Sequence, residues 1–540
     1  MTTKRQLIIH PILLALFPVL FLYSRNANQF PLNVIVLPAL ALVAVTALVW
    51  ACAALVFKSA HKSATLASLV ILLCFSYGIC IDSLRKVWSD STWIGAGCAL
   101  TVALAAVLIT ATLWIRKSPK HIDRFLKIEN FAAACLVVMP LVSIAGAQFR
   151  RANIFSPEHV QRVSRPGAVS AAYPDVYYII LDGYARADIL KDIYGYDNSE
   201  FLNYLTSKGF VVASKSRSNY GQTGLSLSSS LNMDYLDSYT AGYKPNGDDR
   251  TALTGLIAES AVRRFFASQD YSFTVFASNY YLLDLQGADR YIGPTSLNEF
   301  QGGVANMTPL GATDLPYDAH RRRILYAFEH LADPAKDDTR AFVLAHISAP
   351  HPPFVFDAEG KDVNPSREYS MVDGSDLINA DGASWKEYRD GYVGQLAYIN
   401  KLAEKAIDDI LKNAVVPPVI VVQGDHGPGS LLDQESPEDT YLNERFSILN
   451  AYYFPGGAPG ELYDSISPVN TFRVILNHYF GTSCKLLDDD CYFAKWSQPY
   501  RYIAVNKAID AEPREKAAML RNERETAAAA GRERQARSVR

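Results

Sequence analysis

The first 147 residues contain five long apolar segments, and this feature constrains the fold more than any other. Each segment is 17 to 24 residues long and contains no Asp, Glu, Lys or Arg. At about 1.5 Å per residue, a helix of this length matches the hydrocarbon thickness of a bilayer. Five such segments in succession, separated by short charged loops, are not typical of a soluble core. We therefore predict transmembrane helices at Leu7–Tyr23, Val34–Phe57, Thr65–Ile81, Trp93–Ile115 and Asn130–Ala147.

The basic residues between these segments predict the orientation. Nine lysines and arginines lie in the amino-terminal segment and the loops on its side, whereas the alternate short loops hold only Arg25, Arg85 and Lys86. Cytoplasmic loops carry the excess of basic residues, so the amino terminus is predicted to be cytoplasmic. An odd number of helices then delivers the rest of the chain to the periplasmic or extracellular face. The first segment lacks a clear small-residue cleavage site, and we expect it to be retained in the membrane. The nine residues are Lys4, Arg5, Lys58, Lys62, Arg116, Lys117, Lys120, Arg124 and Lys127.

Beyond the apolar segments, composition divides the chain into three further parts. Residues 148–172 show no periodicity and suit a linker at the membrane surface. Residues 173–507 have the pattern of a folded extracytoplasmic domain. Residues 508–540 are rich in Ala, Glu and Arg and predict a frayed helix or a disordered tail. The formal net charge of −3 gives no reason to expect a nucleic-acid partner.

Two cysteines lie outside the membrane segments, seven positions apart in "CKLLDDDC". In an oxidising compartment such a pair commonly forms a local disulfide, so we predict a bond between Cys484 and Cys491. Metal binding by the two thiols alone is the weaker alternative.

Strand-like apolar runs alternate with helical patterns in residues 173–507. This alternation predicts a largely parallel sheet covered by helices on both faces. The strand-like runs are "DVYYIILDG", "GFVVASKS", "YSFTVFAS", "AFVLAHIS", "PVIVVQGD" and "FSILNAYYF"; the helical patterns are Ser199–Lys208, Ala319–Leu331, Trp385–Asn413 and "NTFRVILNHYFG", the last helix expected.

Acidic residues and a histidine follow two of these strands. Asp182 ends "VYYIILDG", and Asp425 with His426 ends "VIVVQGDHG". Open α/β sheets place their ligands at the carboxyl ends of strands, where these residues would meet. Carboxylate oxygens with one imidazole suit a divalent cation such as Mn, Zn or Mg. Each residue alone also fits a helix cap or a polar turn.

Two further segments carry candidate catalytic groups. Thr223 stands at the probable start of a helix in "SNYGQTGLSLSSSL", where it fits either an N-cap or a nucleophile whose charge the helix amino terminus would stabilise. His346 and His351 flank a proline-rich turn in "LAHISAPHPPF", and imidazoles there could hold phosphate oxygens or protonate a leaving group, or merely line an exposed loop. Rival hydroxyls lie inside the same helix as Thr223: Ser226, Ser228, Ser229 and Ser230.

In this order, the strand-end Asp182, the helix-opening Thr223, "HISAPHPPF" and "GDHG" resemble the alkaline phosphatase and sulfatase superfamily. The resemblance is strongest to its membrane branch of lipoteichoic acid synthases, phosphoglycerol transferases and phosphoethanolamine transferases, and covers roughly residues 7–505. It implies that Asp182, Thr223, Asp425 and His426 coordinate a catalytic metal and that Thr223 forms a covalent phospho-intermediate. The chain departs from that branch in having Asp182 where the phosphoethanolamine transferases usually have Glu. No Cys-x-Pro-x-Arg or Ser-x-Pro-x-Arg follows Asn219, so the formylglycine of true sulfatases cannot form.

These features together predict a multi-pass enzyme of a bacterial-type cytoplasmic (inner) membrane with a periplasmic catalytic domain. Thr223 would attack the phosphorus of a phospholipid head group of phosphoglycerol or phosphoethanolamine type and expel diacylglycerol. An envelope glycan or lipid would then accept the head group, with His351 and His346 orienting the phosphate oxygens. Two alternatives remain open: a phosphate or sulfate ester hydrolase that uses the same residues with water, and a non-catalytic membrane scaffold.

Overall fold

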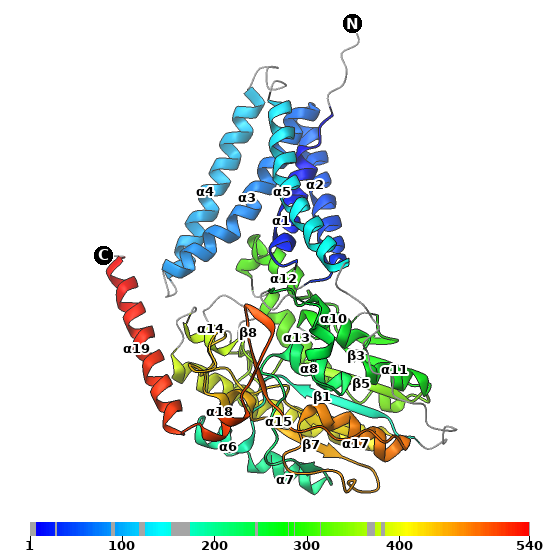
Figure 1. Ribbon diagram of the computed structural model, residues 1–540. Coiled ribbons are helices and arrows are strands. Elements are labelled where there is room, and N and C mark those ends of the chain that lie inside the picture. Colours follow the sequence, from blue (N-terminus) through cyan, green and yellow to red (C-terminus); the bar gives the residue numbers. More distant parts are fainter. Residues whose placement is uncertain are drawn as a thin grey trace. The chain divides into compact units, whose positions relative to one another are not determined.

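The computed structural model divides into two compact units, each described here by itself (Figure 1). One unit comprises Met1–Ile154 with Leu297–Asp318 and Pro365–Glu368, and the other comprises Phe155–Ser296, Ala319–Asn364 and Tyr369–Arg540. We call them the helical unit and the α/β unit. The structure describes residues 7–27, 30–87, 92–117, 125–152, 173–243, 247–278, 280–285, 287–313, 315–363, 373–379 and 384–538. Most of the predicted linker, residues 153–172, lies outside these ranges.

The helical unit contains the five predicted helices. Four spans of 21 to 26 residues are long and apolar enough to cross a membrane, whereas the first helix is shorter, with 16 residues. The prediction of apolar amino-terminal helices is therefore confirmed. The helices are α1 (His10–Arg25), α2 (Val36–Phe57, preceded by the 3-10 turn η1, Leu32–Ile35), α3 (Ala60–Val87), α4 (Thr92–Lys117) and α5 (Leu126–Ala152).

A later stretch of chain also belongs to the helical unit. Helix α12 (Glu299–Asn306) and the 3-10 turn η5 (Pro309–Ala312) lie in Leu297–Asp318. A capping box of Asn298 and Gln301 starts α12. Phe300 is 2% exposed and packs edge-on against the rings of Tyr23 and Phe30, at centroid distances of 6.3 and 5.5 Å. This stretch was not anticipated from the sequence.

The α/β unit is built on a seven-stranded sheet in the order β2-β7-β6-β1-β5-β3-β4. The strands β6, β1, β5, β3 and β4 run parallel, and β7 is antiparallel to both β6 and β2. All six predicted strands are present, so the largely parallel sheet is confirmed. Every residue of β1, β5 and β6 is buried, which is typical of strands covered on both faces. The strands are β1 (Val176–Leu181), β2 (Val211–Val212), β3 (Ser272–Phe276), β4 (Arg290–Ile292), β5 (Ala341–Ile347), β6 (Val419–Gln423) and β7 (Asn450–Tyr453).

Helices follow the strands as the alternating pattern predicted. On one face, Tyr178 of β1 donates a hydrogen bond to Ser230 of α8 and meets the ring of Phe472 of α17 at 5.0 Å. The bounds of these helices are α6 (Ala187–Asp192), α7 (Ser199–Ser207), α8 (Thr223–Asn232), α9 (Asp237–Thr240), α10 (Thr251–Ala258), α11 (Ala261–Ser268), α13 (Leu315–His330), α14 (Gly374–Asn379), α15 (Trp385–Asn413), α16 (Leu442–Phe446) and α17 (Pro468–Phe480), with 3-10 turns η4 (Tyr281–Leu283) and η6 (Pro334–Lys336).

Helix α17 is not the last helix, contrary to the prediction. It is followed by a hairpin of β8 (Tyr492–Lys495) and β9 (Gln498–Ala504), then by α18 (Asn506–Ala511) and α19 (Glu515–Ser538). Helix α19 has no apolar stripe, but it is attached to the α/β unit by cations: Arg524 donates to the carbonyl of Ser430, and Arg521 lies over the ring of Trp385. Polar contacts therefore hold this helix against the α/β unit. Such contacts produce no periodic pattern of apolar residues in the sequence.

The predicted disulfide is wrong, because Cys484 and Cys491 are both free thiols. The segment between them runs along α17, whose Asn477 and Asn470 accept hydrogen bonds from the amides of Cys484 and Leu487. Cys491 is 0% exposed in a cluster with Leu432, Leu442, Phe446 and Phe493. These contacts keep the two ends of the segment apart, whereas a disulfide would require the two sulfur atoms to meet.

Candidate metal centre

The register of the three central strands brings the predicted acidic residues to one edge of the sheet. Ile180 of β1 lies beside His346 of β5 and beside Gln423 of β6. Asp182 and Asp425 each lie two residues beyond this level, on neighbouring parallel strands. Because each acid follows its strand at the same distance along the chain, the two carboxylates lie side by side at the edge of the sheet.

The polar atoms at this edge lie close together and away from solvent. The Oδ2 atom of Asp182 lies 3.4 Å from Nε2 of His346. Nε2 of His426 lies 3.7 Å from Oδ1 of Asp182 and 3.4 Å from Oδ2 of Asp425. The most exposed of these four residues, Asp182, is only 4% exposed. His346, which we predicted to orient phosphate oxygens, thus lies among the candidate metal ligands.

Three of these buried atoms have no hydrogen-bond partner among the described residues: Oδ1 of Asp182, Oδ2 of Asp425 and Nε2 of His346. Buried polar atoms are nearly always satisfied in folded proteins, so three together need an explanation. Asp182, His346 and Asp425 each offer one ligand atom within 4.8 Å of the others. Two hard oxygens and an imidazole nitrogen fit a divalent cation such as Mn or Zn.

The hydrogen bonds of His426 determine which of its nitrogens faces the acids. Nδ1 lies 2.9 Å from the carbonyl oxygen of Gly427, and since a carbonyl can only accept, Nδ1 carries the proton. Burial lowers the pKa of His426, and nearby Arg445 lowers it further, which favours the neutral ring. Nε2 then presents a lone pair toward two carboxylates, an arrangement that a cation would stabilise.

Thr223 is the first residue of α8 and points to the same place. Its Oγ1 lies 3.0 Å from Nε2 of His426. Gln222 occupies the N-cap position and makes no side-chain cap, so Thr223 is not used as an N-cap. The rival hydroxyls of α8 that have a partner donate to backbone carbonyls: Ser226 to Asp425, Ser229 to Asp234 and Ser230 to Leu227.

His351 lies beside this group and is suited to hold a proton. Its ring lies 6.3 Å from that of His426, and its Nδ1 lies 2.5 Å from the carbonyl of Pro352. Burial alone would lower the pKa of His351, but the carboxylates of Asp182 and Asp373 outweigh it and raise the pKa. In the same way, burial opposes ionisation of Asp182, yet His351 and His346 hold its pKa well below the usual range. A charged imidazole beside ionised carboxylates is therefore the favoured state.

Sequence reasoning missed two residues of this site, Asp373 and Arg445. The Arg445 guanidinium donates to both oxygens of Asp373, at 3.2 and 2.8 Å, and to the carbonyls of Gly221 and Gly427 at 2.6 and 3.3 Å. It thereby connects the loop before Thr223 with the turn after β6. Neither residue ends a strand, so no pattern in the sequence indicated them.

Two glycines allow the backbone to pack this closely. Gly183 has a φ of +72°, and its amide donates to Oδ1 of Asp425 at 3.1 Å. A Cβ atom on Gly427 would lie 1.9 Å from the carbonyl oxygen of Glu444. Gly183 is therefore required by its backbone conformation, and Gly427 by the lack of space for a side chain.

Comparison with known proteins gives only distant structural likenesses. No protein-family model and no curated protein matches the sequence. One similar solved structure is the C-terminal periplasmic domain of EcEptC from Escherichia coli, with 11% identity, a TM-score of 0.41, and coverage of 64% of this chain and 96% of that one. The lipooligosaccharide phosphoethanolamine transferase EptA from Neisseria meningitidis has 13% identity, a TM-score of 0.37 and coverage of 87% and 95%. The putative sulfatase yidJ from Bacteroides fragilis has 16% identity, a TM-score of 0.39 and coverage of 62% and 84%.

Proposed function

We propose that this chain is a metal-dependent phosphotransferase that moves a phospholipid-derived head group to an envelope glycan or lipid through a phospho-threonine. The observation that carries the proposal is the hydroxyl of Thr223, 3.0 Å from Nε2 of His426, beside two buried carboxylates that have unpaired oxygens. A nucleophile, a set of cation ligands and a proton donor are thus available within one cluster of polar groups.

In this proposal Asp182, Asp425, His426 and Thr223 would hold the ion, and Nε2 of His346 lies 3.4 Å from Oδ2 of Asp182 in the same cluster. A bound divalent cation would lower the pKa of the Thr223 hydroxyl, whose proton would pass to solvent, and would polarise a phosphoryl oxygen. The amide groups at the start of α8 favour negative charge on the transferred phosphoryl group.

The reaction proceeds in two displacements at phosphorus. The Thr223 oxygen bonds to phosphorus, the bond to the lipid glycerol oxygen breaks, and His351 gives its proton to the departing diacylglycerol. The acceptor oxygen then bonds to phosphorus and gives its proton to His351, and the bond between phosphorus and the Thr223 oxygen breaks. The Thr223 oxygen takes back a proton from solvent, which restores the starting state. The raised pKa of His351 supports this role, since the ring must be protonated when the first leaving group departs.

Attachment to apolar helices supports a lipid donor over a soluble ester. Four of these helices are long enough to cross a bilayer, so a lipid head group is a substrate available at the membrane surface.

The test follows lipid products of the full-length protein in vesicles that contain phosphatidylglycerol and phosphatidylethanolamine. We expect diacylglycerol release, and a phospho adduct on Thr223 by mass spectrometry of peptides from protein quenched with acid. Thr223→Ala should lose both, Thr223→Ser should keep part of the activity, and Ser229→Ala is the matched control from the same helix.

The outcomes separate the three candidate functions. Transfer is supported if diacylglycerol is released only when an acceptor molecule gains the mass of the head group. Release of the phosphorylated head group to water, without an acceptor, indicates a hydrolase. An adduct on a serine, or full turnover by Thr223→Ala, contradicts the assignment of the nucleophile, and the absence of any turnover together with no bound ion indicates a scaffold.

A further inference from the structure

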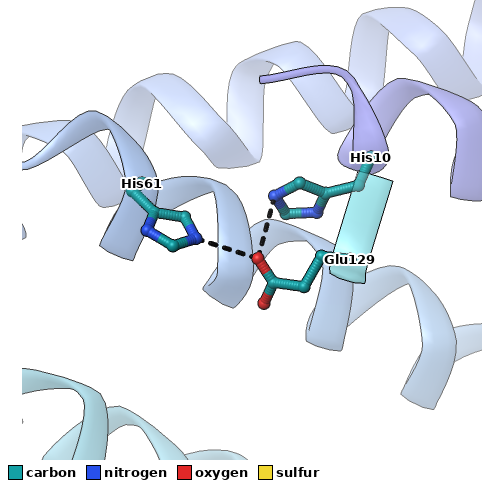
Figure 2. A group of neighbouring side chains, drawn as sticks. All are labelled: His10, His61 and Glu129. Carbon is teal, nitrogen blue, oxygen red and sulfur yellow. Dashed lines mark hydrogen bonds and ion pairs between the residues drawn. The ribbon is translucent and has the colours of Figure 1, made fainter. Parts of the chain in front are cut away.

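A second cluster of metal-ligand side chains lies in the helical unit, apart from the site described above. His10 is the first residue of α1, His61 the second of α3 and Glu129 the fourth of α5. In Figure 2 both imidazoles point toward the carboxylate of Glu129. Alternate helices of an up-and-down bundle begin at the same end, so the three residues meet although they are far apart in sequence.

The cluster is tight and largely buried. Nε2 of His61 lies 2.9 Å and Nε2 of His10 lies 3.4 Å from Oε2 of Glu129. His10 is 0% and His61 5% exposed, whereas the side chain of Glu129 is 26% exposed. One ligand atom from each residue lies within 4.8 Å of the others. The group is therefore closed on the imidazole side and open to small molecules on the carboxylate side.

A second set of contacts orients these side chains. Nδ1 of His10 lies 2.7 Å from Oγ of Ser68, and the hydroxyl of Thr65 donates to Oε1 of Glu129 at 3.0 Å. Asn130 accepts from the amide of His10 at 3.0 Å and fixes the start of α1. Metal-binding histidines usually have the nitrogen opposite the ligand atom held in this way.

One atom of the cluster is left without a hydrogen bond. Nε2 of His10 is buried and has no hydrogen-bond partner among the described residues. An unsatisfied buried imidazole nitrogen costs stability, and ionisable side chains are rare in helices this apolar unless they serve a function. Oε2 of Glu129 lies 3.4 Å from it, so that an ion bound beside both atoms would satisfy the nitrogen.

We propose that His10, His61 and Glu129 bind a Zn²⁺ ion at this end of the helical unit. Two imidazoles and one carboxylate with an open fourth position is a known zinc ligand set. Bond lengths of about 2.0–2.1 Å in a tetrahedral site place ligand atoms about 3.3 Å apart, close to the 3.4 Å between His10 and Glu129. The 2.9 Å hydrogen bond between His61 and Glu129 would lengthen as the ion replaces its proton. The ion would cross-link α1, α3 and α5 and stabilise their packing.

The experiment measures metal in the full-length protein, in detergent, with the α/β site removed by Asp182→Ala and Asp425→Ala. After exposure to Zn²⁺ and dialysis, this double variant should retain about one zinc per chain by elemental mass spectrometry. Adding Glu129→Gln should remove that zinc, because the amide keeps the shape and the hydrogen bond from Thr65 but loses the charge. His478→Ala, which changes an exposed histidine, is the matched control and should retain zinc.

Cobalt gives a readout that does not depend on the Glu129 variant folding. Co²⁺ bound by the double variant should show the strong visible absorption of a four-coordinate ion. The proposal fails if the double variant holds neither zinc nor such cobalt, or if Glu129→Gln leaves the zinc content unchanged. It stands independently of the phosphotransferase proposal, since lipid turnover is not measured.

Discussion

Replacing Arg445 by alanine is expected to destabilise the α/β unit by about 3–5 kcal/mol, the usual cost of breaking a buried ion pair by removing one partner. Arg445 is 2% exposed and makes two hydrogen bonds to Asp373. Burial opposes ionisation of Asp373, but Arg445 and His351 hold its pKa well below the usual range. The substitution would leave the carboxylate of Asp373, whose side chain is only 16% exposed, without its cation.

The same substitution also removes the donors to the carbonyls of Gly221 and Gly427, at 2.6 and 3.3 Å. These two carbonyls flank Thr223 and His426, so we expect turnover to fall more than stability alone explains. Arg445→Lys should recover part of the stability, because one ammonium replaces the charge but cannot reach both oxygens of Asp373 and both loops.

The assay is urea-induced unfolding in detergent, followed by protease sensitivity of the α/β unit, for Arg445→Ala and Arg445→Lys. Arg445→Met, Asp373→Leu and the double variant of these two form a second set that tests the coupling of the pair. Apolar replacement of both partners should restore most of the stability that the single variants lose, because no buried charge is then unpaired. Activity should stay low in all three. If the losses of the single variants simply add in the double variant, the pair is not energetically coupled and the reasoning is wrong.

Three other results are expected. Asp182→Ala or Asp425→Ala should remove the bound ion of the α/β unit and all turnover while leaving the sheet folded; full activity in either variant would exclude that residue as a ligand. Asp175 has its pKa raised from 3.8 to about 6, chiefly by burial, so the folded state binds its proton more tightly than the unfolded one and stability falls as pH rises from about 4 to 6. Asp175→Asn should therefore gain up to about 3 kcal/mol at pH 8 and lose this slope in pH-dependent unfolding, whereas an unchanged slope would contradict it. A reporter enzyme fused after Arg540 should be active only outside the cytoplasm, and cytoplasmic activity would refute the predicted topology.

The sequence predicted those parts of the fold that leave a strong local signal. Apolar runs without charges located the helices, and buried β-branched runs such as Val419–Gln423 located the central strands. Since parallel strands end at one edge of a sheet, the same patterns predicted that Asp182 lies near Asp425. The three-residue strand β4 was not predicted, because so short a run shows no periodicity. For residues 508–540 the composition left a frayed helix and a disordered tail as alternatives, because the arginines that dock α19 leave no apolar stripe.

The rest of the site depends on tertiary contacts that local sequence does not encode. Asp373 lies before a six-residue helix and Arg445 within a five-residue one, and neither position carries a motif. Cys484 and Cys491 had the spacing of a disulfide, but Asn470 and Asn477 of α17 hold the intervening segment along the helix. Likewise His10, His61 and Glu129 are 51 and 68 residues apart in turn, and only the order of the helices brings them together.

The stretch Leu297–Asp318, which packs with the amino-terminal helices, has a practical consequence for protein production. A soluble fragment that starts at Tyr173 would retain Phe300 but lose the aromatic partners Tyr23 and Phe30 that now cover it. The uncovered apolar side chains would favour aggregation of the fragment during expression. Replacing residues 297–318 by a short polar linker should give a more soluble sample for crystallisation than truncation at Tyr173 alone.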